Sequence, residues 1–381
     1  MLKNRVVIID FNHLAYQYMF TGGYSLSVPV VENGVTVNKD TRVQSGTIKR
    51  IYKWSQNGTL PTAVCFDRPV TVRKEYFEEN FADMKIGGEA EYKGGRSKMP
   101  DSMYTAISDV EYILRKGGVS VFSENQYEAD DLIFACVQRA KVRYPGYKID
   151  VITNDADLLP LVDDTVSVFI RSKKGTWAES SELEKSKYVQ VTPDNYEEYI
   201  EGLSAFQGFR VPYNTVLLYK LLRGDVSDNY RRKDISKMFP PKKYNALIDR
   251  LIEDNVNISE IFRYGEPTME IRYKASDEVY EGTLDDAKQS DVRHLLYQKI
   301  MNPYELDAIL KVLRKYTDMS DSMLSHIEKM YWGINLNQIY VNKKHGSVRR
   351  EFECEKHGDI HTFSEIELQK ACNPLQIRLL R

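Results

Sequence analysis

Nine acidic side chains stand where separate elements of the chain could bring them together. Most follow a short apolar run directly or within a few residues, and two close a helical pattern; they are Asp10, Asp67, Glu128, Asp130, Asp131, Asp155, Asp157, Asp225 and Asp228. Oxygen ligands without histidine or thiolate suit hard ions such as Mg²⁺ or Mn²⁺ rather than zinc. Nine acids are too many for one ion. Two ions roughly 4 Å apart are the usual arrangement for cleaving phosphodiesters, one activating the attacking water and the other stabilising the leaving oxygen. The pattern therefore predicts a two-ion site.

Each group of these acids also has a purely structural interpretation. Acids in the first turn of a helix cap free amides and suit the helix dipole, which would explain residues 128–131 and, after Asn154, residues 155–157. Asp10 could end a strand by side-chain hydrogen bonding, and the Gly-Asp-x-x-Asp string at 224–228 could be an ordinary turn. For any single group the structural interpretation is favoured. For nine acids along one edge metal binding is favoured, because close like charges raise one another's pKa and cost stability unless cations neutralise them.

The elements that must position these acids read as an α/β domain. Strands are expected at residues 6–9, 63–66, 119–122, 149–153 and 166–170, and helical spacing recurs between them around 48–52, 107–114 and 132–137. Strands alternating with helices in this way predict a mostly parallel, twisted sheet flanked by helices. The carboxyl ends of parallel strands share one edge, which is where such folds bind ligands. Independent strands are therefore expected to aim their acids at one place.

The same patterns divide the chain into three expected parts. Residues 1–205 form the α/β domain, with an insert at about 68–101; residues 206–325 form a helical domain; residues 326–381 form a small C-terminal extension. Helical spacing in the later parts is found at 216–222, 244–251, 293–300 and 306–316, and short strands are expected at 339–341 and 350–354.

Basic and aromatic side chains in two segments predict a nucleic-acid surface beside the acids. In the insert, Tyr92 stands beside Lys93, and two glycines precede Arg96; this supplies a stacking ring and two cations for phosphates on a bendable backbone. Between residues 220 and 243 eight basic residues face three acidic ones, which suggests a face that follows a phosphate backbone. A solvated helix face is the alternative for this second segment.

Composition limits the class of protein. The 381 residues carry 53 Lys+Arg and 55 Asp+Glu, a formal net charge of −2, which argues against a grossly basic DNA coat protein. The apolar run at residues 6–9 is too short for a signal sequence or a membrane span, and four scattered cysteines suit a reducing compartment. We therefore expect a soluble cytoplasmic protein with no membrane partner. No phosphate-binding G-x-x-x-x-G-K-[ST] string occurs, so nucleotide-driven motor chemistry is not expected.

Six strings then give the sequence a resemblance to a known family. They are VIIDF at 7–11, CFDRP at 65–69, EYKGGR at 91–96, YEADD at 127–131, TNDADLL at 153–159 and GDVSDN at 224–229. In this order they resemble the 5′ nucleases, which include flap endonucleases and the 5′-exonuclease domains of bacterial DNA polymerases. The form is closest to the bacteriophage replication nucleases, including phage-type ribonuclease H, for which the location would be the host cytoplasm. The resemblance covers about residues 5–230 and implies a PIN-like 5′ nuclease fold.

The resemblance also implies a role for each matching side chain. Asp10, Asp67, Glu128, Asp130, Asp131 and Asp155 would surround the first Mg²⁺ or Mn²⁺, with Asp157, Asp225 and Asp228 towards the second. Lys93 and Arg96 would stabilise the charge that develops on the scissile phosphate, and Tyr92 would stack on a base near the 5′ end. Tyr76 is a second candidate for base stacking.

Further basic residues are expected to contact nucleic acid. Arg73, with Lys74 beside it, would lie at the base of the arch over which the family threads or clamps a 5′ single strand. The family's glycine-rich helix-hairpin-helix turn is replaced here by residues 230–235 and 239–241. Duplex binding is therefore expected to rest on side chains such as Arg231, Arg232 and Lys233.

The implied activity is that of a metal-dependent 5′-3′ exonuclease or flap endonuclease, with Asp157, Lys93 and Arg96 as catalytic residues. Its substrate would be DNA with a 5′ end or flap, or an RNA-DNA duplex, in replication or repair, and hydrolysis would leave a 5′-phosphate. We expect a monomer, with a single-stranded-DNA-binding protein or another replisome protein as a partner. Two alternatives stay open: a PIN-type ribonuclease, which would not need the 91–96 string, and a non-catalytic DNA-end-binding replisome protein.

The C-terminal extension holds one further candidate site. Cys354, His357, His361 and Cys372 have the spacing C-x2-H-x3-H-x10-C, which could bind zinc. A structural interpretation is favoured, because Cys372 falls at an expected helix end and structural zinc sites show tighter ligand pairs.

Overall fold

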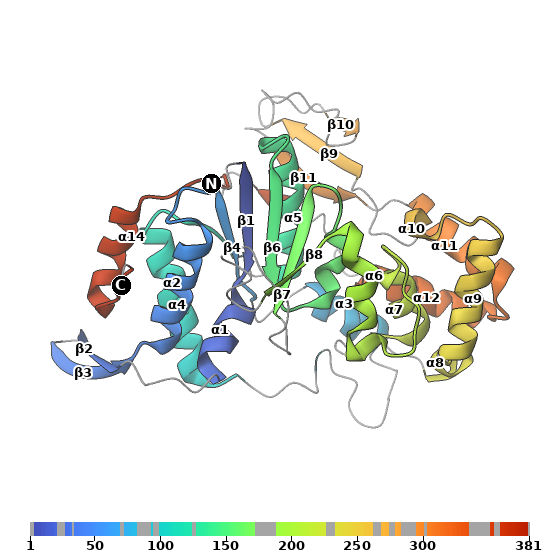
Figure 1. Ribbon diagram of the computed structural model, residues 1–381, viewed down its shortest axis with the longest axis horizontal. Coiled ribbons are helices and arrows are strands. Elements are labelled where there is room, and N and C mark those ends of the chain that lie inside the picture. The colour runs from blue at the N-terminus through green and yellow to red at the C-terminus, as the bar shows by residue number, and fades with distance from the viewer. Residues whose placement is uncertain are drawn as a thin grey trace.

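In the computed structural model, a six-stranded sheet runs through the first half of the chain (Figure 1). In spatial order its strands are β5 (Ser120–Phe122), β4 (Thr62–Cys65), β1 (Arg5–Asp10), β6 (Lys148–Thr153), β7 (Val166–Arg171) and β8 (Tyr188–Val191). The first five are parallel, and β8 pairs antiparallel with β7. The predicted mostly parallel sheet is confirmed. The structure describes residues 4–20, 27–32, 34–68, 72–81, 93, 99–123, 127–171, 188–225, 233–261, 268–273, 279–282, 295–300, 303–334, 351–353 and 359–379.

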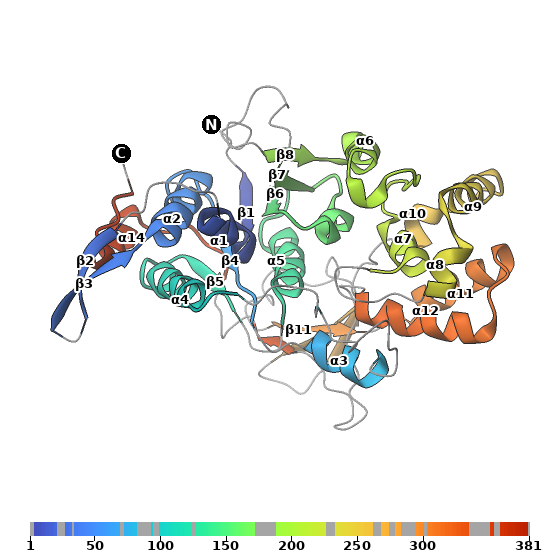
Figure 2. The ribbon, with the colours of Figure 1, turned by 90° about the horizontal axis from the view of Figure 1, so that it is seen from below.

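Helices cover both faces of this sheet. Val6 and Ile8 of β1 are buried in one apolar cluster, and Val7 and Ile9 are buried in another. The second cluster is closed by α1 (Phe11–Phe20), α2 (Arg42–Trp54) and α4 (Asp101–Lys116), while α5 (Ala129–Arg143) covers the opposite face, as Figure 2 shows. Burial on both faces explains why β1 carries an unbroken apolar run, residues 6–9, rather than an alternating pattern.

The later helices extend the cluster on the α5 side. They are α6 (Tyr196–Glu201), α7 (Val216–Arg223), α8 (Lys233–Met238), α9 (Pro241–Glu253), α10 (Ile258–Ile261), α11 (Pro303–Tyr316) and α12 (Asp321–Ile334). α12 contacts α7, α11 and the earlier helix α3 (Val72–Phe81). The boundary expected between residues 325 and 326 falls inside α12. Among the described helices, none is both long and apolar enough to cross a membrane.

A second, antiparallel sheet differs from the sequence-based expectation. Its strands, in spatial order, are β10 (Val279–Gly282), β9 (Thr268–Tyr273), β11 (Leu295–Ile300) and β12 (Glu351–Glu353). β12 confirms the strand expected near 350–354, and the one expected at 339–341 lies outside the described residues. The helical prediction for 293–300 is wrong over β11. Its short apolar run fits either period, and pairing with strands on both sides decides the outcome.

A hairpin and the C-terminal segment complete the fold. β2 (Ser27–Glu32) and β3 (Val35–Asp40) pair antiparallel between α1 and α2, and this hairpin projects from one end of the molecule (Figure 1). Near the chain end, α14 (Glu365–Cys372) packs on α4. Thr62 donates its backbone N–H to His361 O at 3.1 Å, and Phe363 donates its own to Gly58 O at 3.1 Å. This segment is therefore part of the core of the α/β domain.

The contacts of the C-terminal segment also bear on the zinc candidate. Cys372, the last residue of α14, is fully buried in the apolar cluster to which α2 and α4 contribute. The His361 ring lies among backbone and hydroxyl groups, with Nδ1 3.1 Å from Ser120 Oγ and Nε2 3.1 Å from Gly118 O. Cys354 and His357 lie outside the described residues. The surroundings of the two described side chains favour the structural interpretation.

Candidate active site

Three of the predicted acids follow neighbouring parallel strands. Asp10 is the last residue of β1, Asp67 lies two residues beyond β4, and Asp155 lies two residues beyond β6. Asp10 is buried; its Oδ2 accepts a hydrogen bond from Thr153 Oγ1 at 2.8 Å and its Oδ1 one from the His13 amide at 3.4 Å. Because β4, β1 and β6 run in the same direction side by side, these acids share the carboxyl edge of the sheet.

Three more acids gather at the start of α5. Glu128 is the N-cap, and it forms a capping box with Asp131, whose Oδ2 accepts a hydrogen bond from the Glu128 amide at 3.3 Å. Asp67 reaches the same helix end, where its Oδ1 accepts a hydrogen bond from the Ala129 amide at 2.7 Å. The structural interpretation of these acids is therefore correct. The same hydrogen bonds fix the acids in place, so capping and a site role are compatible.

The acids along this edge act on one another electrostatically. Burial, then the charge of Asp67, raises the pKa of Asp10 to about 7, and Asp155 adds to the shift. Burial, then Asp155, Asp10 and Asp67, raises the pKa of Asp130 well above its ordinary value. The sheet edge and the start of α5 therefore form one group of carboxylates that repel one another.

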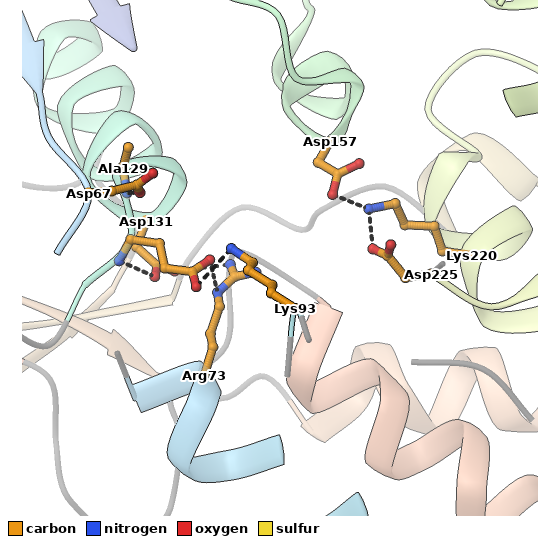
Figure 3. Close-up of polar contacts among 9 residues, drawn as sticks. Asp67, Arg73, Lys93, Ala129, Asp131, Asp157, Lys220 and Asp225 are labelled. Carbon is orange, nitrogen blue, oxygen red and sulfur yellow. Dashed lines mark hydrogen bonds and ion pairs between the residues drawn. The ribbon is translucent and has the colours of Figure 1, made fainter. Parts of the chain in front are cut away.

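Two cations lie against the start of α5, as Figure 3 shows. Arg73, in the first turn of α3 and buried, places Nη2 3.1 Å from Asp131 Oδ1 and Nε 4.0 Å from Glu128 Oε2. Lys93 Nζ lies 3.0 Å from Glu128 Oε1, and the lysine side chain is 24% exposed. Lys93 also adopts a left-handed φ of 57°, which is uncommon for a residue with a side chain. Arg73 and Lys93 therefore both lie beside the acids at the start of α5.

A second group of acids is joined by a lysine that the sequence did not single out. Lys220 of α7 places Nζ 2.5 Å from Asp157 Oδ2 and 2.7 Å from Asp225 Oδ2 (Figure 3). Lys220 and Asp225 are each 6% exposed. Burial, then Asp155, raises the pKa of Asp157 to about 7, and Lys220 opposes this shift. In the sequence Lys220 was only one of eight basic residues in its segment, and nothing local marked it as buried.

Asn12 is another side chain that sequence reasoning missed. Its Nδ2 donates a hydrogen bond to Asp67 Oδ2 at 3.1 Å, while its Oδ1 is buried and has no hydrogen-bond partner among the described residues. Asn12 is buried in α1, two residues after Asp10. Only this position, just after a strand that ends in an acid, could have drawn attention to it.

The remaining predicted residues are placed as follows. Lys74 is on α3, where its Nζ lies 3.7 Å from Glu78 Oε1 at the surface, and Lys233 is the exposed first residue of α8. The base-stacking prediction for Tyr76 is wrong, because its ring is buried and its hydroxyl donates to Lys329 O at 2.9 Å. Outside the described residues lie Tyr92, Arg96, Asp228, Arg231 and Arg232.

The donor set can be compared with the needs of a metal ion. Within the described part of the chain, no three Asp, Glu, His or Cys side chains stand close enough together to hold one ion as they are. Arg73, Lys93 and Lys220 lie against the acids instead. The donors themselves fit a hard divalent cation, since they are carboxylates from separate elements that raise one another's pKa. Binding would require the acids to turn away from these cations.

The two helical layers, the parallel sheet and the acids at its carboxyl edge define a PIN-like α/β domain. The family model for the N-terminal resolvase-like domain of 5′-3′ exonucleases matches residues 5–190. The 5′-3′ exonuclease of Mycoplasma pneumoniae is 30% identical over 239 residues, which cover 60% of this chain and 71% of that protein. The chain belongs to the 5′-3′ exonuclease family.

Other similar proteins are longer or more distant. DNA polymerase I of Lactococcus lactis subsp. cremoris is 30% identical over 229 residues, 60% of this chain. The match spans only 22% of the length of that polymerase. Among solved structures, a flap endonuclease of bacteriophage T5, in complex with DNA and metal ions, matches 85% of this chain and 99% of its own, with 16% identity and a TM-score of 0.45.

Proposed function

We propose that this chain is a metal-dependent 5′ nuclease that hydrolyses phosphodiesters near the 5′ ends or flaps of DNA or RNA-DNA duplexes, in replication or repair. The observation that carries the proposal is the repelling group of acids at the carboxyl edge, where Asp10, Asp67, Asp130 and Asp155 come from separate elements. Such an arrangement costs stability unless cations neutralise the carboxylates, and a bound divalent cation would do so. Family membership supports the choice of phosphodiester chemistry.

The acids divide into two candidate sets of ligands. Asp10, Asp67, Glu128, Asp130, Asp131 and Asp155 would hold the first cation; Asp157, Asp225 and Asp228 would hold the second. When bound, such ions supply a reactive nucleophile and neutralise charge on the phosphate. Thr153 and the His13 amide keep Asp10 in place, and Asn12 does the same for Asp67. These bonds fix the ligands before the substrate arrives.

Basic side chains would complete the chemistry and the grip on the substrate. Lys93 is partly exposed next to Glu128, so its ammonium is available to a phosphate that binds above the acids. With Arg73 and Arg96, it would stabilise the negative charge that develops during cleavage. We assign duplex binding to the helical part from residue 206, through exposed cations such as Lys233, and base stacking to Tyr92.

The proposal is tested by exchanging one acid for its amide. Asp157→Asn removes a proposed ligand, while Asp163→Asn makes the same change just before β7, at the opposite edge of the sheet, where Asp163 pairs with Lys141. With Mg²⁺ and a 5′-flap DNA, Asp157→Asn should lose cleavage by at least about a hundredfold and keep its affinity for DNA. Asp163→Asn should cleave like the unaltered protein. A fully active Asp157→Asn variant would overturn the proposal.

A further inference from the structure

Helix α12 lies against both helices that deliver buried cations to the acids. α3 carries Arg73 and α7 carries Lys220, and α12 contacts each of them. Figure 2 shows α12 between these two helices. α12 spans Asp321–Ile334, well beyond the residues 5–190 that the family model matches. A single helix of the later part of the chain therefore supports both cation-bearing helices.

The contact with α3 is made by the same part of that helix that carries Arg73. Tyr76 is one turn after Arg73, so the two side chains are neighbours on the helix surface. The Tyr76 hydroxyl donates to the Lys329 carbonyl of α12 at 2.9 Å, and burial raises the pKa of the phenol, which stays protonated and able to donate. Phe81 adds an edge contact with the His326 ring, with centroids 5.6 Å apart.

The contact with α7 is a packed apolar one. Leu217 and Leu221 of α7 and Ile327 and Tyr331 of α12 are all at most 1% exposed and belong to one apolar cluster. Close-packed interiors transmit displacement rather than absorb it, so a shift of α12 would move α7 and with it Lys220. α12 thus bears on the Asp157–Lys220–Asp225 group as well.

Neither cation-bearing helix is long enough to hold its own position. α3 has 10 residues and α7 has 8, and helices of fewer than about 12–15 residues are marginal in isolation. Their placement must come from tertiary contacts. For α3, two of these contacts run to α12, through Tyr76 and Phe81.

We propose that α12 is a brace that holds α3 and α7 at the acidic edge, and that Tyr76 is a positioning residue that fixes Arg73 beside Glu128 and Asp131. The hydroxyl of Tyr76 is bonded to α12, so Tyr76 acts on Arg73 through helix α3. The proposal deepens the proposed nuclease function and rests on it for any kinetic readout. A second readout, the exchange of the α3 backbone amides with solvent, does not depend on activity.

The test compares two tyrosines that each donate to a backbone carbonyl. Tyr76→Phe removes the hydroxyl that reaches α12, and Tyr144→Phe removes the one that reaches Ile360, at the far end of α5 from Glu128. Hydrogen exchange of the α3 amides should become at least about tenfold faster in Tyr76→Phe and stay unchanged in Tyr144→Phe. Equal exchange in both variants would overturn the brace, whether or not the protein proves to be a nuclease.

A double-mutant cycle then separates positioning from a general loss of stability. In single-turnover cleavage at saturating DNA, Tyr76→Phe should slow the reaction by between about threefold and thirtyfold, with little change in the Kd for DNA. In an Arg73→Ala background the same change should have no further effect, because its route to the acids is already removed. If the rate losses of Tyr76→Phe and Arg73→Ala multiplied in the double variant, the assignment of Tyr76 as a positioning residue for Arg73 would be contradicted. If the unaltered protein cleaves nothing, the proposed function fails, and the amide exchange alone decides the brace.

Discussion

Asp10 shows, at the scale of one residue, how much folding stability the acidic edge costs when no metal is bound. Burial and Asp67 raise its pKa to about 7, against 3.8 for an exposed aspartate. The unfolded chain loses this proton at lower pH than the folded one, so the free energy of unfolding falls as pH rises from about 4 to about 7. We predict that Asp10→Asn stabilises the protein in a chelator by about 1–3 kcal/mol at pH 8 and by little at pH 4. Thermal unfolding at the two pH values measures this.

The control for this prediction uses the same chemical change elsewhere. An asparagine at position 10 has the same size and can still accept the 2.8 Å hydrogen bond from Thr153; it gives up only the longer, 3.4 Å bond from the His13 amide. Asp163→Asn, at the opposite edge of the sheet, should give no stabilisation at pH 8, because Asp163 pairs with Lys141. If Asp10→Asn were destabilising at pH 8 in a chelator, the acids would not be repelling one another as described.

Lys220 gives the opposite expectation, because it compensates charge. Removing it leaves Asp157 and the buried Asp225 facing each other. We predict that Lys220→Ala costs about 3–5 kcal/mol of stability in a chelator at pH 8, as expected for breaking a buried ion pair. Lys141→Ala, whose partner Asp163 is 37% exposed, should cost less than about 1 kcal/mol. Denaturant unfolding compares the two, and similar losses would argue against a special role for Lys220.

At the scale of elements, the C-terminal segment is held by a close approach between two helices. A Cβ added to Gly117, at the end of α4, would lie 2.9 Å from Leu368 Cα of α14. We predict that Gly117→Ala lowers stability by about 1–3 kcal/mol, since the helices would have to separate. Gly202 ends α6 in a similar conformation with no atom closer than 3.4 Å to an added Cβ, so Gly202→Ala should be close to neutral. Melting temperatures test the pair; a neutral Gly117→Ala would mean that α14 is loosely packed.

The elements also show how far sequence reasoning reached. Mostly apolar runs such as residues 6–9 identified the parallel strands, because burial on both faces leaves that signature. The run at β11 misled, since six residues fit a helix or a strand equally well until the pairing partners are known. The C-terminal segment gave no sign in its own sequence that it packs on α4. Local patterns therefore predicted the strands whose residue types reflect their own burial. They did not predict β11 or the C-terminal segment, whose structure depends on contacts with residues far away in the sequence.

The same limit applies to the candidate site. The acids could be predicted, because each one follows a strand or starts a helix, and the fold brings those points together. Lys220 and Asn12 could not, because their roles depend on which side chains meet them across the fold. The prediction for Tyr76 was wrong for the same reason. An aromatic residue beside basic ones resembles a stacking ring, but the fold buries Tyr76 of α3 against α12.

At the scale of the whole molecule, opposite charges are segregated. Setting the nine acids aside leaves 46 acidic against 53 basic residues, so the rest of the chain carries +7. An uncompensated acidic edge should repel phosphates that the basic remainder attracts. We predict that Ca²⁺ tightens binding of 5′-flap DNA at least about fivefold relative to a chelator, by neutralising the edge. Asp157→Asn should reduce this ratio of affinities, because it removes one repelling charge and so tightens binding in the chelator, whereas Asp163→Asn should leave the ratio unchanged. Equal affinity with and without Ca²⁺ would contradict this electrostatic account.

The central claim, that this acidic edge is the site of a metal-dependent 5′ nuclease, is tested most directly by digestion of flap DNA labelled at both its 5′ and 3′ ends. With Mg²⁺, we predict that the 5′ label is released in short products, while the 3′ label stays on a long fragment that carries a new 5′-phosphate. In a chelator we predict no cleavage. Degradation from the 3′ end, equal cleavage in the chelator, or no cleavage with either Mg²⁺ or Mn²⁺ would contradict the claim.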